Sequence, residues 1–486
     1  MTRLPGNPLV VDLDGTLTRS DLLYESVCGL LKKNILYGFM LPVWLMRGKA
    51  AMKQEIADRV DVDVELLPWN TEFVDYLKDQ KEAGRRLILA TASNEKYAQQ
   101  VADYHGIFDD VIASGGDGQN ASGSNKVERV KALLGDEAFD YAGNSAVDLK
   151  VWEHAENAVL VDAAPGLEKQ ALEIVNVERV FDNRQSQFRM FLKAMRGHQW
   201  LKNLLLFVPA MLAREIADPS VFLNVCLAFV SFSLCASSVY LLNDLFDLSS
   251  DRQHPRKCKR PFAAGNLSLA TGLIGVVVLL VVAFGIAFFL PWSFFFVLLD
   301  YYILTMAYSI VLKRAMFIDV LVLAALYTMR LIAGAAAAEV EASFWLLAFS
   351  MFTFLSLALI KRYSELLVKA SQGDDRVAGR AYRFVDLESL SQMGAASGYA
   401  AVLVLALYID SDEVSATYHH PEALWLFCPM MLYWISRLWI LTRRGEMHDD
   451  PVVFTIRDRR THWLGLIAVL VMAAAVLIGD AGLQLL

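Results

Sequence analysis

The sequence predicts two parts: an N-terminal α/β domain with a small helical cap, followed by an all-α bundle of nine membrane-spanning helices. The chain has 486 residues, of which 56% are hydrophobic, and a mean hydropathy of +0.38, which is too apolar for an ordinary soluble enzyme. Apolar stretches of spanning length begin only near residue 200. The formal charge of -8 lies before that point, because residues 1–195 hold 30 acidic and 22 basic side chains, whereas the remainder holds 23 of each.

The N-terminal part alternates short apolar runs with amphipathic helical segments. The runs "LVVDLD", "RLILATAS" and "NAVLVDA" are expected to be strands, and this alternation is typical of a soluble α/β domain. The first residues lack the basic start, apolar centre and cleavage site of a signal peptide, so we expect them inside the cell. The five cysteines show no CxxC pair and no regular spacing, which favours reduced structural thiols over a zinc site or a disulfide framework.

Nine apolar stretches follow, and a membrane span needs about 20 residues. They are 200–214, 219–242, 268–290, 292–312, 319–338, 344–362, 394–410, 421–444 and 462–483. The connections after the second, fourth, sixth and eighth stretches are rich in Lys and Arg, whereas the intervening ones carry only Arg214. The positive-inside rule then predicts a multi-pass protein of the inner (cytoplasmic) membrane, with its N-terminal domain and active sites in the cytoplasm and its C-terminus outside.

A cluster of acids and cations follows the second stretch, in "NDLFDLSSDRQHPRKCKRP". Charged loops at membrane surfaces are often simply solvated. Here, however, Asn243, Asp244, Asp247 and Asp251 fall largely along one helical face, so that their oxygens can converge on Mg²⁺. The cations after them can neutralise the remaining charge of a bound pyrophosphate. They are Arg256, Lys257, Lys259 and Arg260.

"NDLFDLSSD" and the trailing "RPFAAG" resemble the first aspartate-rich motif, NDxxDxxxD, of the UbiA-type intramembrane prenyltransferase superfamily. The resemblance extends from "RGHQWLKN" to the end of the chain. It implies the nine-helix fold of that family, with an active site that opens to the cytoplasm. Family members that transfer a prenyl group carry a second aspartate-rich motif after the sixth helix.

That second motif is poorly matched in this chain, which has "KRYSELLVKASQGDDRVAGRAYR" at the corresponding place. Asp374 and Asp375 lie in a Gly-bearing loop beyond Glu365, whereas Lys361, Arg362 and Glu365 are expected to occupy the helix end. Two cations and one acid suit a further phosphate group better than a second pair of metal ions.

Together with "QWLKN", "YSIVLKR" and "RLIAG", this substitution is similar to one branch of the superfamily, the decaprenyl-phosphate phosphoribosyltransferases. The resemblance implies 5-phosphoribosyl diphosphate as donor, a polyprenyl phosphate as acceptor and Mg²⁺-assisted departure of pyrophosphate. Asp244 and Asp247 are then expected to be catalytic, and they bind metal together with Asp251. The expected substrate-binding residues are Lys202, Asn203, Asn243, Lys257, Arg260, Tyr308, Lys313, Arg330, Lys361, Arg362 and Glu365.

Two ionisable residues stand inside predicted spans, where they are costly. For Arg330 a phosphate contact is favoured over a structural salt bridge to Asp319 or another inward acid. Asp300 is expected to be paired with a cation or neutral.

Four further motifs occur in order before residue 150: "VVDLDGTLT", "LILATAS", "GSNKVERV" and "YAGNSAVD". Asp12 and Asp14 end an apolar run, the position where open α/β sheets bind ligands. The set resembles the haloacid dehalogenase (HAD) phosphatase superfamily, which implies a Rossmann-like sheet. Residues 17 to 85 read as the cap.

The resemblance implies a role for each motif residue. Asp12 is the expected nucleophile that forms an aspartyl phosphate, and Asp14 the acid that protonates the leaving alcohol and later activates water. Thr91 and Lys126 are expected to bind the phosphoryl group, and Asp148 to complete a Mg²⁺ site with Asp12 and Asp14. The fourth motif departs from the family at Asn144, where an acid is usual. An active domain is favoured over a purely structural one.

The predicted domains are 1–180, an amphipathic linker at 181–199 and the membrane domain at 200–486. The linker either lies on the inner leaflet or is a plain connecting helix. The two resemblances predict a bifunctional enzyme that makes polyprenyl-phospho-5-phosphoribose and then removes its 5-phosphate.

Two alternatives remain at this point. One is an aromatic or quinone prenyltransferase in which Glu365 and Asp374 form a second metal site. The other is a non-catalytic N-terminal domain that regulates or assembles the membrane domain. The expected partners are the donor, the lipid and the membrane, with no nucleic acid, and homo-oligomerisation is left open.

Overall fold

The protein is represented by a computed structural model, which describes residues 6–115, 121–164, 166–370, 381–411, 414, 421–447 and 450–477. The chain divides into two compact units. One comprises residues 1–197 and 240–278, and the other comprises 198–239 and 279–486. The first unit therefore contains the aspartate-rich stretch as well as the N-terminal domain. The predicted domain limits at 180 and 199 stay predictions.

The N-terminal domain is built on a six-stranded parallel sheet in the order β3-β2-β1-β4-β5-β6. Its strands are β1 (Leu9–Val11), β2 (Leu87–Asn94), β3 (Asp110–Ser114), β4 (Asp140–Gly143), β5 (Asn157–Val161) and β6 (Asn176–Phe181). Because β1 pairs with β2 on one side and β4 on the other, the strand order reverses at β1. Ligands bind beyond the carboxyl end of such a strand, which is where Asp12 and Asp14 lie.

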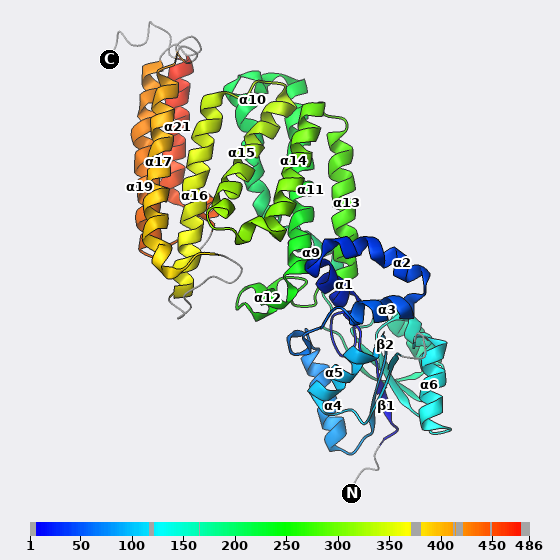
Figure 1. Cartoon of the computed structure of the whole chain (residues 1–486). Coiled ribbons are helices and arrows are strands. Elements are labelled where there is room, and N and C mark those ends of the chain that lie inside the picture. The colour runs from blue at the N-terminus through cyan, green and yellow to red at the C-terminus, as the bar shows by residue number, and fades with distance from the viewer. Residues whose placement is uncertain are drawn as a thin grey trace. The chain divides into compact units, whose positions relative to one another are not determined.

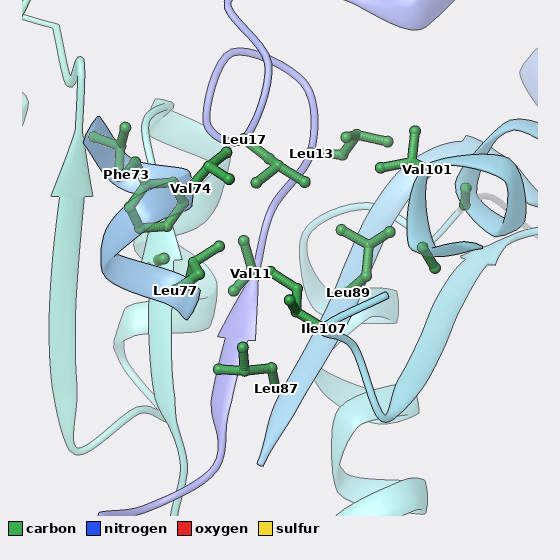
Figure 2. Packing of buried hydrophobic residues seen from close by; sticks show 14 of the residues in the cluster. Val11, Leu13, Leu17, Phe73, Val74, Leu77, Leu87, Leu89, Val101 and Ile107 are labelled. Carbon is green, nitrogen blue, oxygen red and sulfur yellow. The ribbon is translucent and has the colours of Figure 1, made fainter. Parts of the chain in front are cut away.

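Both faces of the sheet are buried, as expected for parallel strands. Leu9 and Val11 pack with one hydrophobic cluster and Val10 with the other, because successive strand side chains point to opposite faces. Figure 2 shows the first cluster, in which Val11, Leu87 and Leu89 meet side chains of the flanking helices. The helices of the domain are α4 (Thr71–Glu82), α5 (Glu95–His105), α6 (Ser124–Leu134), α7 (Leu149–Trp152) and α8 (Leu167–Ile174), with η3 (Ala146–Asp148) before α7.

The cap is helical, as predicted, but it ends before α4. The predicted bounds of 17 to 85 are too wide, because α4 packs in the hydrophobic core of the sheet. The cap consists of α1 (Leu22–Lys33), η1 (Ile35–Phe39), α2 (Met40–Met46), α3 (Lys49–Ala57) and η2 (Val64–Leu66). A separate small core of Val27, Leu30, Trp44, Ile56 and Val60 holds it together. The predicted linker contains α9 (Gln187–Ala194).

Seven helices of the described chain are long and apolar enough to cross a membrane, and they make this a multi-pass membrane protein (Figure 1). The spans are Pro219–Phe246, Leu269–Ala287, Trp292–Ile310, Ile318–Ala338, Phe344–Ala370, Phe384–Ile409 and Glu422–Arg443. They contain α11 (Pro219–Phe246), α13 (Leu269–Ala287), α14 (Trp292–Ile310), α15 (Ile318–Ala338), α16 (Phe344–Ala370), α17 (Leu387–Ile409) and α19 (Phe427–Arg443). Shorter elements are α12 (Leu248–Gln253), η6 (Lys257–Lys259), η7 (Leu312–Arg314), η8 (Phe384–Asp386), η9 (Pro421–Leu426) and α20 (Pro451–Arg457).

The first and last of the nine predicted stretches differ from this pattern. Residues 200–214 do not form one helix but belong to η4 (Gly197–Phe207) and the five-residue α10 (Val208–Leu212), before η5 (Glu215–Ala217). Pro209 suits the first turn of α10 because it lacks an N–H donor, and the buried Lys202 and Asn203 bond to side chains of other helices. The last stretch contains α21 (Arg459–Leu477), which ends where the described residues end and is not among the seven.

Candidate active sites

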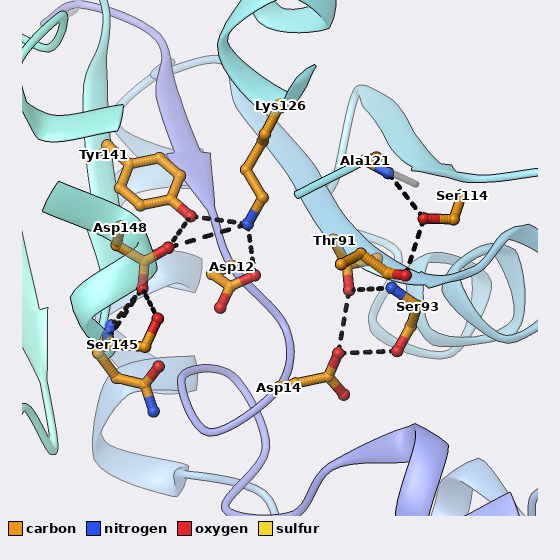
Figure 3. A network of polar contacts seen from close by, with 12 residues as sticks. Asp12, Asp14, Thr91, Ser93, Ser114, Ala121, Lys126, Tyr141, Ser145 and Asp148 are labelled. Carbon is orange, nitrogen blue, oxygen red and sulfur yellow. Dashed lines mark hydrogen bonds and ion pairs between the residues drawn. The ribbon is translucent and has the colours of Figure 1, made fainter. Parts of the chain in front are cut away.

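The four N-terminal motifs meet at the carboxyl end of the sheet, as predicted (Figure 3). Asp12 follows β1, Thr91 lies in β2, Lys126 lies in the first turn of α6 and Asp148 ends η3 after β4. All four side chains are buried. Strand ends that are far apart in sequence become neighbours here because every strand of the sheet runs in the same direction.

Lys126 is the cation at the centre of this group. Its Nζ donates hydrogen bonds to Asp12 Oδ1 at 2.8 Å and to the Tyr141 hydroxyl at 2.8 Å, and it lies 4.0 Å from Asp148 Oδ1. Burial opposes the charge on Lys126, but the neighbouring Asp12 and Asp148 outweigh it and raise its pKa. Lys126 is therefore held charged between Asp12, the predicted nucleophile, and Asp148, the predicted metal ligand.

The acids of this site outnumber its central cation. Burial raises the pKa of Asp12 to about 7; Lys126 opposes this shift, and Asp148 and Asp14 add to it. Burial, followed by the charge of Asp21, raises the pKa of Asp14 to about 6. Buried carboxylates with excess negative charge are the hard oxygen ligands that Mg²⁺ prefers, so the residues fit a divalent cation. Among the described residues, no group of three Asp, Glu, His or Cys side chains is arranged so that it could hold a metal ion by itself.

Asp14 is oriented by the cap and by the end of β2. Its Oδ1 accepts the Leu22 N–H at 2.9 Å, and its Oδ2 accepts the hydroxyls of Thr91 at 3.2 Å and Ser93 at 2.7 Å. The Thr91 hydroxyl also accepts the Ser93 N–H. The prediction named Thr91 but missed Ser93, although both stand in the quoted motif "LILATAS".

Asp148 is held by the turn that precedes it. Its Oδ2 accepts the N–H groups of Asn144 and Ser145 and the Ser145 hydroxyl, and its Oδ1 accepts the Tyr141 hydroxyl at 2.7 Å. Tyr141 was not predicted, although it is the first residue of the quoted motif "YAGNSAVD" and lies on a buried strand. A side chain at Gly15 would meet the Asn144 amide, so Asn144 lies against the loop that carries Asp12 and Asp14.

The aspartate-rich stretch is a near-continuous helix with a break at Asp247, between α11 and α12. Asp244 and Asp251 are buried, whereas Asn243 and Asp247 are half-buried. Arg260 Nη1 lies 3.0 Å from Asp244 Oδ1 and 2.6 Å from Asp251 Oδ2, and Arg196 also bonds to Asp244. Predicted acids and a predicted cation are thus brought together, with a guanidinium between the two buried carboxylates.

One oxygen of this stretch fits a cation ligand. Asp251 Oδ1 is buried and accepts no hydrogen bond in the described structure, and Lys257 Nζ lies 3.9 Å away. Asp247 lies 3.9 Å from Lys32 Nζ. The donor set is carboxylate oxygen, which suits Mg²⁺, and its assignment to Asp244, Asp247 and Asp251 stays a prediction.

In the second unit, Asp450 lies between two residues that were predicted to bind substrate, Lys202 and Lys361. Its Oδ2 accepts hydrogen bonds from Lys202 Nζ at 2.9 Å and Lys361 Nζ at 3.2 Å. Burial opposes ionisation of Asp450, but the two lysines outweigh it and hold its pKa well below the usual range. Sequence reasoning missed Asp450, whose only local signal is its position as the N-cap before Pro451 of α20.

A second polar group surrounds Arg362. Its guanidinium bonds to Asp319 at 2.5 Å, to the Tyr308 hydroxyl at 3.0 Å and to Glu365. Asp319 also accepts the Tyr382 hydroxyl at 2.6 Å. Three predicted residues are therefore neighbours, and the acid that was considered as a structural partner of Arg330 contacts Arg362.

Arg330 is buried among polar and aromatic groups of α11, α14 and α15. Its Nε donates to Asn203 Oδ1 at 2.9 Å, and the guanidinium carbon lies 5.2 to 5.3 Å from the ring centres of Phe232, Tyr301 and Tyr327. Asn203 donates in turn to the Ser233 hydroxyl at 2.9 Å. Predicted Arg330 and Asn203 are thus direct partners.

The sequence also singled out charged residues in two connections and in the fourth predicted span. Lys313 lies in η7, between α14 and α15. Asp300 is exposed on α14. Asp374 and Asp375 lie outside the described residues.

Comparison with known proteins divides the chain in the same way. The haloacid dehalogenase-like hydrolase family matches residues 9–153, and the UbiA prenyltransferase family matches residues 203–381. The chain is 34% identical to protein y4nM of Sinorhizobium fredii over 463 residues, which cover 94% of this chain and 89% of y4nM. It is 31% identical to the decaprenyl-phosphate phosphoribosyltransferase of Mycobacterium tuberculosis over 294 residues, covering 59% of this chain and 94% of that protein.

Among solved structures, a UbiA homolog from Archaeoglobus fulgidus bound to DMAPP and Mg²⁺ is similar over 59% of this chain and 97% of that one, with 16% identity and a TM-score of 0.46. The parallel sheet with its acid–lysine site and the helical bundle define a membrane enzyme with two different domains. The chain belongs to the UbiA prenyltransferase family and carries a haloacid dehalogenase-like domain before the family's helical region.

Proposed function

We propose that the membrane domain transfers a phosphoribosyl group from 5-phosphoribosyl diphosphate to a polyprenyl phosphate. An oxygen of the lipid phosphate forms a bond to the ribose C1 as the bond from C1 to pyrophosphate breaks, so the products are polyprenyl-phospho-5-phosphoribose and pyrophosphate. The observation that carries the proposal lies within α16, where Lys361 and Arg362 stand in place of the acids of a second metal motif. The helix continues beyond them to Ala370, so they do not occupy the helix end as predicted. The 31% identity to the Mycobacterium tuberculosis enzyme supports the same substrates.

The pyrophosphate and the 5-phosphate of the donor would bind at different sites, because the residues around them carry different charges. The acids Asp244, Asp247 and Asp251 would hold Mg²⁺, which would neutralise the pyrophosphate as it leaves. Arg260 and Lys257 would bind its remaining oxygens, with Asn243 beside them. The separate 5-phosphate suits cations, and it would contact Lys202, Lys361, Arg362 and Arg330, whose present partners are the protein groups described above.

We assign the remaining predicted residues to positions around these phosphates. Tyr308 and Glu365 orient the Arg362 guanidinium through the contacts described above. Asn203 orients Arg330 in the same way. Lys313 stands in a connection that we expect at the cytoplasmic face from the positive-inside rule, where an anionic lipid phosphate would approach.

The N-terminal domain would then remove the 5-phosphate to leave polyprenyl-phospho-ribose. The ionised Asp12 attacks the phosphorus, and Asp14 gives its proton to the departing ribose oxygen. Asp14 next takes a proton from water, which attacks the aspartyl phosphate and regenerates Asp12. Lys126 and Thr91 hold the phosphoryl oxygens, and Mg²⁺ held by Asp12, Asp14 and Asp148 would balance their charge.

The orientation in the membrane belongs to the same proposal. The positive-inside rule predicts that the N-terminal domain and the aspartate-rich stretch lie on the cytoplasmic side of the inner membrane and that the C-terminus lies outside. Both steps then occur on one leaflet, and the lipid does not have to cross the bilayer between them.

The direct test uses the purified full-length protein with labelled 5-phosphoribosyl diphosphate, polyprenyl phosphate and Mg²⁺. Mass analysis of the organic extract should show polyprenyl-phospho-ribose. Asp12→Asn should accumulate the form that retains the 5-phosphate, and Asp244→Asn should form no ribolipid. If no ribolipid forms with any of the divalent ions tested, the transferase proposal is rejected. If Asp12→Asn gives the same phosphate content as the wild type, the phosphatase is rejected and a regulatory domain is favoured.

The match to the UbiA prenyltransferase family favours a second candidate, transfer of a prenyl group from a prenyl diphosphate to an aromatic acceptor. That reaction would require Glu365 and Asp374 as a second metal site. Substitution of Asp374 and Asp375 by asparagine separates the two candidates. Loss of all transfer supports the prenyl reaction, whereas near-normal transfer supports the ribosyl one.

A further inference from the structure

The cap contains an apolar segment, Ile35–Met46, whose side chains point largely into solvent. Phe39 and Met46 have exposed fractions of 79% and 82%, and Leu36 is 60% exposed. Ile35, Met40, Val43 and Leu45 are also exposed. Soluble proteins rarely present so many large apolar side chains within one short segment, and such a patch marks a binding surface.

The exposure is not that of a loosely attached loop. Asn34 caps η1 by accepting the Leu36 N–H, and Trp44 of α2 is buried in the core of the cap. The guanidinium of Arg59 lies 5.0 Å from the centre of the Trp44 ring. One side of the segment is therefore anchored to the cap, which presents the other side as an ordered apolar surface.

The charges around the segment indicate what covers it. Residues 26–54 contain no Asp or Glu and five cations, although residues 1–195 as a whole are acidic. Lys32 and Lys33 precede the segment, Arg47 and Lys49 follow it, and all four are exposed. Apolar side chains flanked by cations fit the boundary between acyl chains and anionic headgroups of a bilayer.

We propose that Ile35–Met46 is a membrane-contact segment that inserts Leu36, Phe39 and Met46 into the surface of the bilayer. The occupant is lipid, and the bilayer is available because the same chain has seven spanning helices. A segment of this kind lies in the interface, about 5–10 Å deep, and does not cross the membrane.

The position of the segment links it to the phosphatase-like site. It connects α1, whose first N–H group bonds to Asp14, with α3, whose Lys53 donates to the Ala92 carbonyl at 2.5 Å next to Thr91 and Ser93. Contact of the segment with lipid would therefore hold both α1 and α3 of the cap at the membrane surface. If the proposed function is also correct, this favours a phosphate that is attached to a lipid over a freely soluble one.

The test places single cysteines in the full-length protein reconstituted in nanodiscs, in a background where the half-buried Cys226 and Cys258 are replaced by serine. An environment-sensitive fluorophore is attached at Phe39→Cys or Met46→Cys. Leu172→Cys is the control, because Leu172 is an exposed apolar residue of α8, which is not part of the cap. Quenching by nitroxide-labelled lipid is compared with quenching by iodide.

We expect lipid-borne nitroxide to quench positions 39 and 46 at least ~2-fold more than position 172, and iodide to show the reverse, because a surface-lying helix buries its apolar face. Adding phosphatidylglycerol to phosphatidylcholine should increase the lipid quenching, since the flanking cations attract anionic headgroups. Quenching of 39 and 46 by iodide as strong as that of 172 overturns the proposal. Protection from both quenchers also overturns it, because the occupant is then another protein.

A second measurement separates this inference from the proposed function. The double variant Phe39→Glu, Met46→Glu should lose hydrolysis of the lipid-linked phosphate while its hydrolysis of p-nitrophenyl phosphate stays within ~2-fold of wild type, because the site itself is intact. Leu172→Glu should change neither. If the wild type hydrolyses neither compound, the phosphatase proposal fails, and the quenching result still decides whether the segment touches lipid.

Discussion

One guanidinium nitrogen of Arg260 lies between two buried carboxylates, 3.0 Å from Asp244 Oδ1 and 2.6 Å from Asp251 Oδ2. The acids that the sequence assigns to metal are thus neutralised in part by a side chain of the same motif. Binding of Mg²⁺ and pyrophosphate would free this guanidinium to contact phosphate oxygens. The pair of contacts would therefore link the predicted metal site to the proposed leaving group.

Arg260→Gln should destabilise the protein and make its stability depend on divalent ions. Loss of one partner from a buried ion pair costs about 3–5 kcal/mol, and Mg²⁺ can replace the lost charge. Thermal unfolding in detergent should therefore show a larger Mg²⁺-dependent increase in Tm for the variant than for the wild type. Lys259→Gln removes an exposed neighbouring cation and is the control. Equal responses to Mg²⁺ in all three proteins would contradict this account.

The raised pKa values of Asp12 and Asp14 predict an unusual pH dependence in the absence of divalent ions. A carboxyl group whose pKa is raised by folding stabilises the protein below its unfolded pKa, near 3.8, and this contribution is lost as pH rises through about 7 for Asp12 and about 6 for Asp14. The free energy of unfolding should fall across that range. Asp12→Asn should flatten the dependence, because it removes the group that ionises.

Mg²⁺ should reverse this trend, since it stabilises the ionised carboxylates. The pH at which phosphate release reaches half its maximum should shift downward as the Mg²⁺ concentration rises. The measurement is the rate of phosphate release against pH at several Mg²⁺ concentrations. A midpoint that does not move with Mg²⁺ would show that the metal does not bind these carboxylates.

Asp450→Asn should weaken donor binding because Lys202 and Lys361 lose their shared acceptor charge. We expect the KM for 5-phosphoribosyl diphosphate to rise at least ~10-fold, about 1.4 kcal/mol of binding energy, with a smaller change in kcat. Asp458→Asn is the matched control, because Asp458 forms an ion pair with Arg437, which is not among the predicted site residues. The same rise in KM for both variants would indicate a general effect on the bundle.

Tyr141→Phe should lower phosphate release by about 10-fold without unfolding the domain. The hydroxyl bridges Lys126 and Asp148, and one hydrogen bond to a charged group is worth about 1.5–3 kcal/mol. Release of the 5-phosphate from the ribolipid is the measurement. Tyr97→Phe removes another buried hydroxyl, which donates to the Val60 carbonyl, and should leave the rate unchanged. An unaffected rate in Tyr141→Phe would mean that the bridge is not needed.

The sequence by itself determined the two-part architecture, the α/β domain with its cap and the phosphatase-like motifs that meet at the ends of the strands. These features follow from local patterns. Apolar runs in the sequence predict strands and membrane spans, and parallel strands bring their carboxyl ends to one edge of the sheet. The contact between Asp12 and Lys126 was expected from the resemblance of their motifs to the haloacid dehalogenase superfamily.

Only the tertiary structure decided which charges neutralise one another. Lys202 and Asp450 are 248 residues apart and Arg362 and Asp319 are 43 apart, so no local pattern connects them. The stretch predicted to span at 200–214 is divided between η4 and α10 and does not form a single α-helix. Its polar residues are stabilised by side chains on other helices, and hydropathy along the chain does not record those contacts.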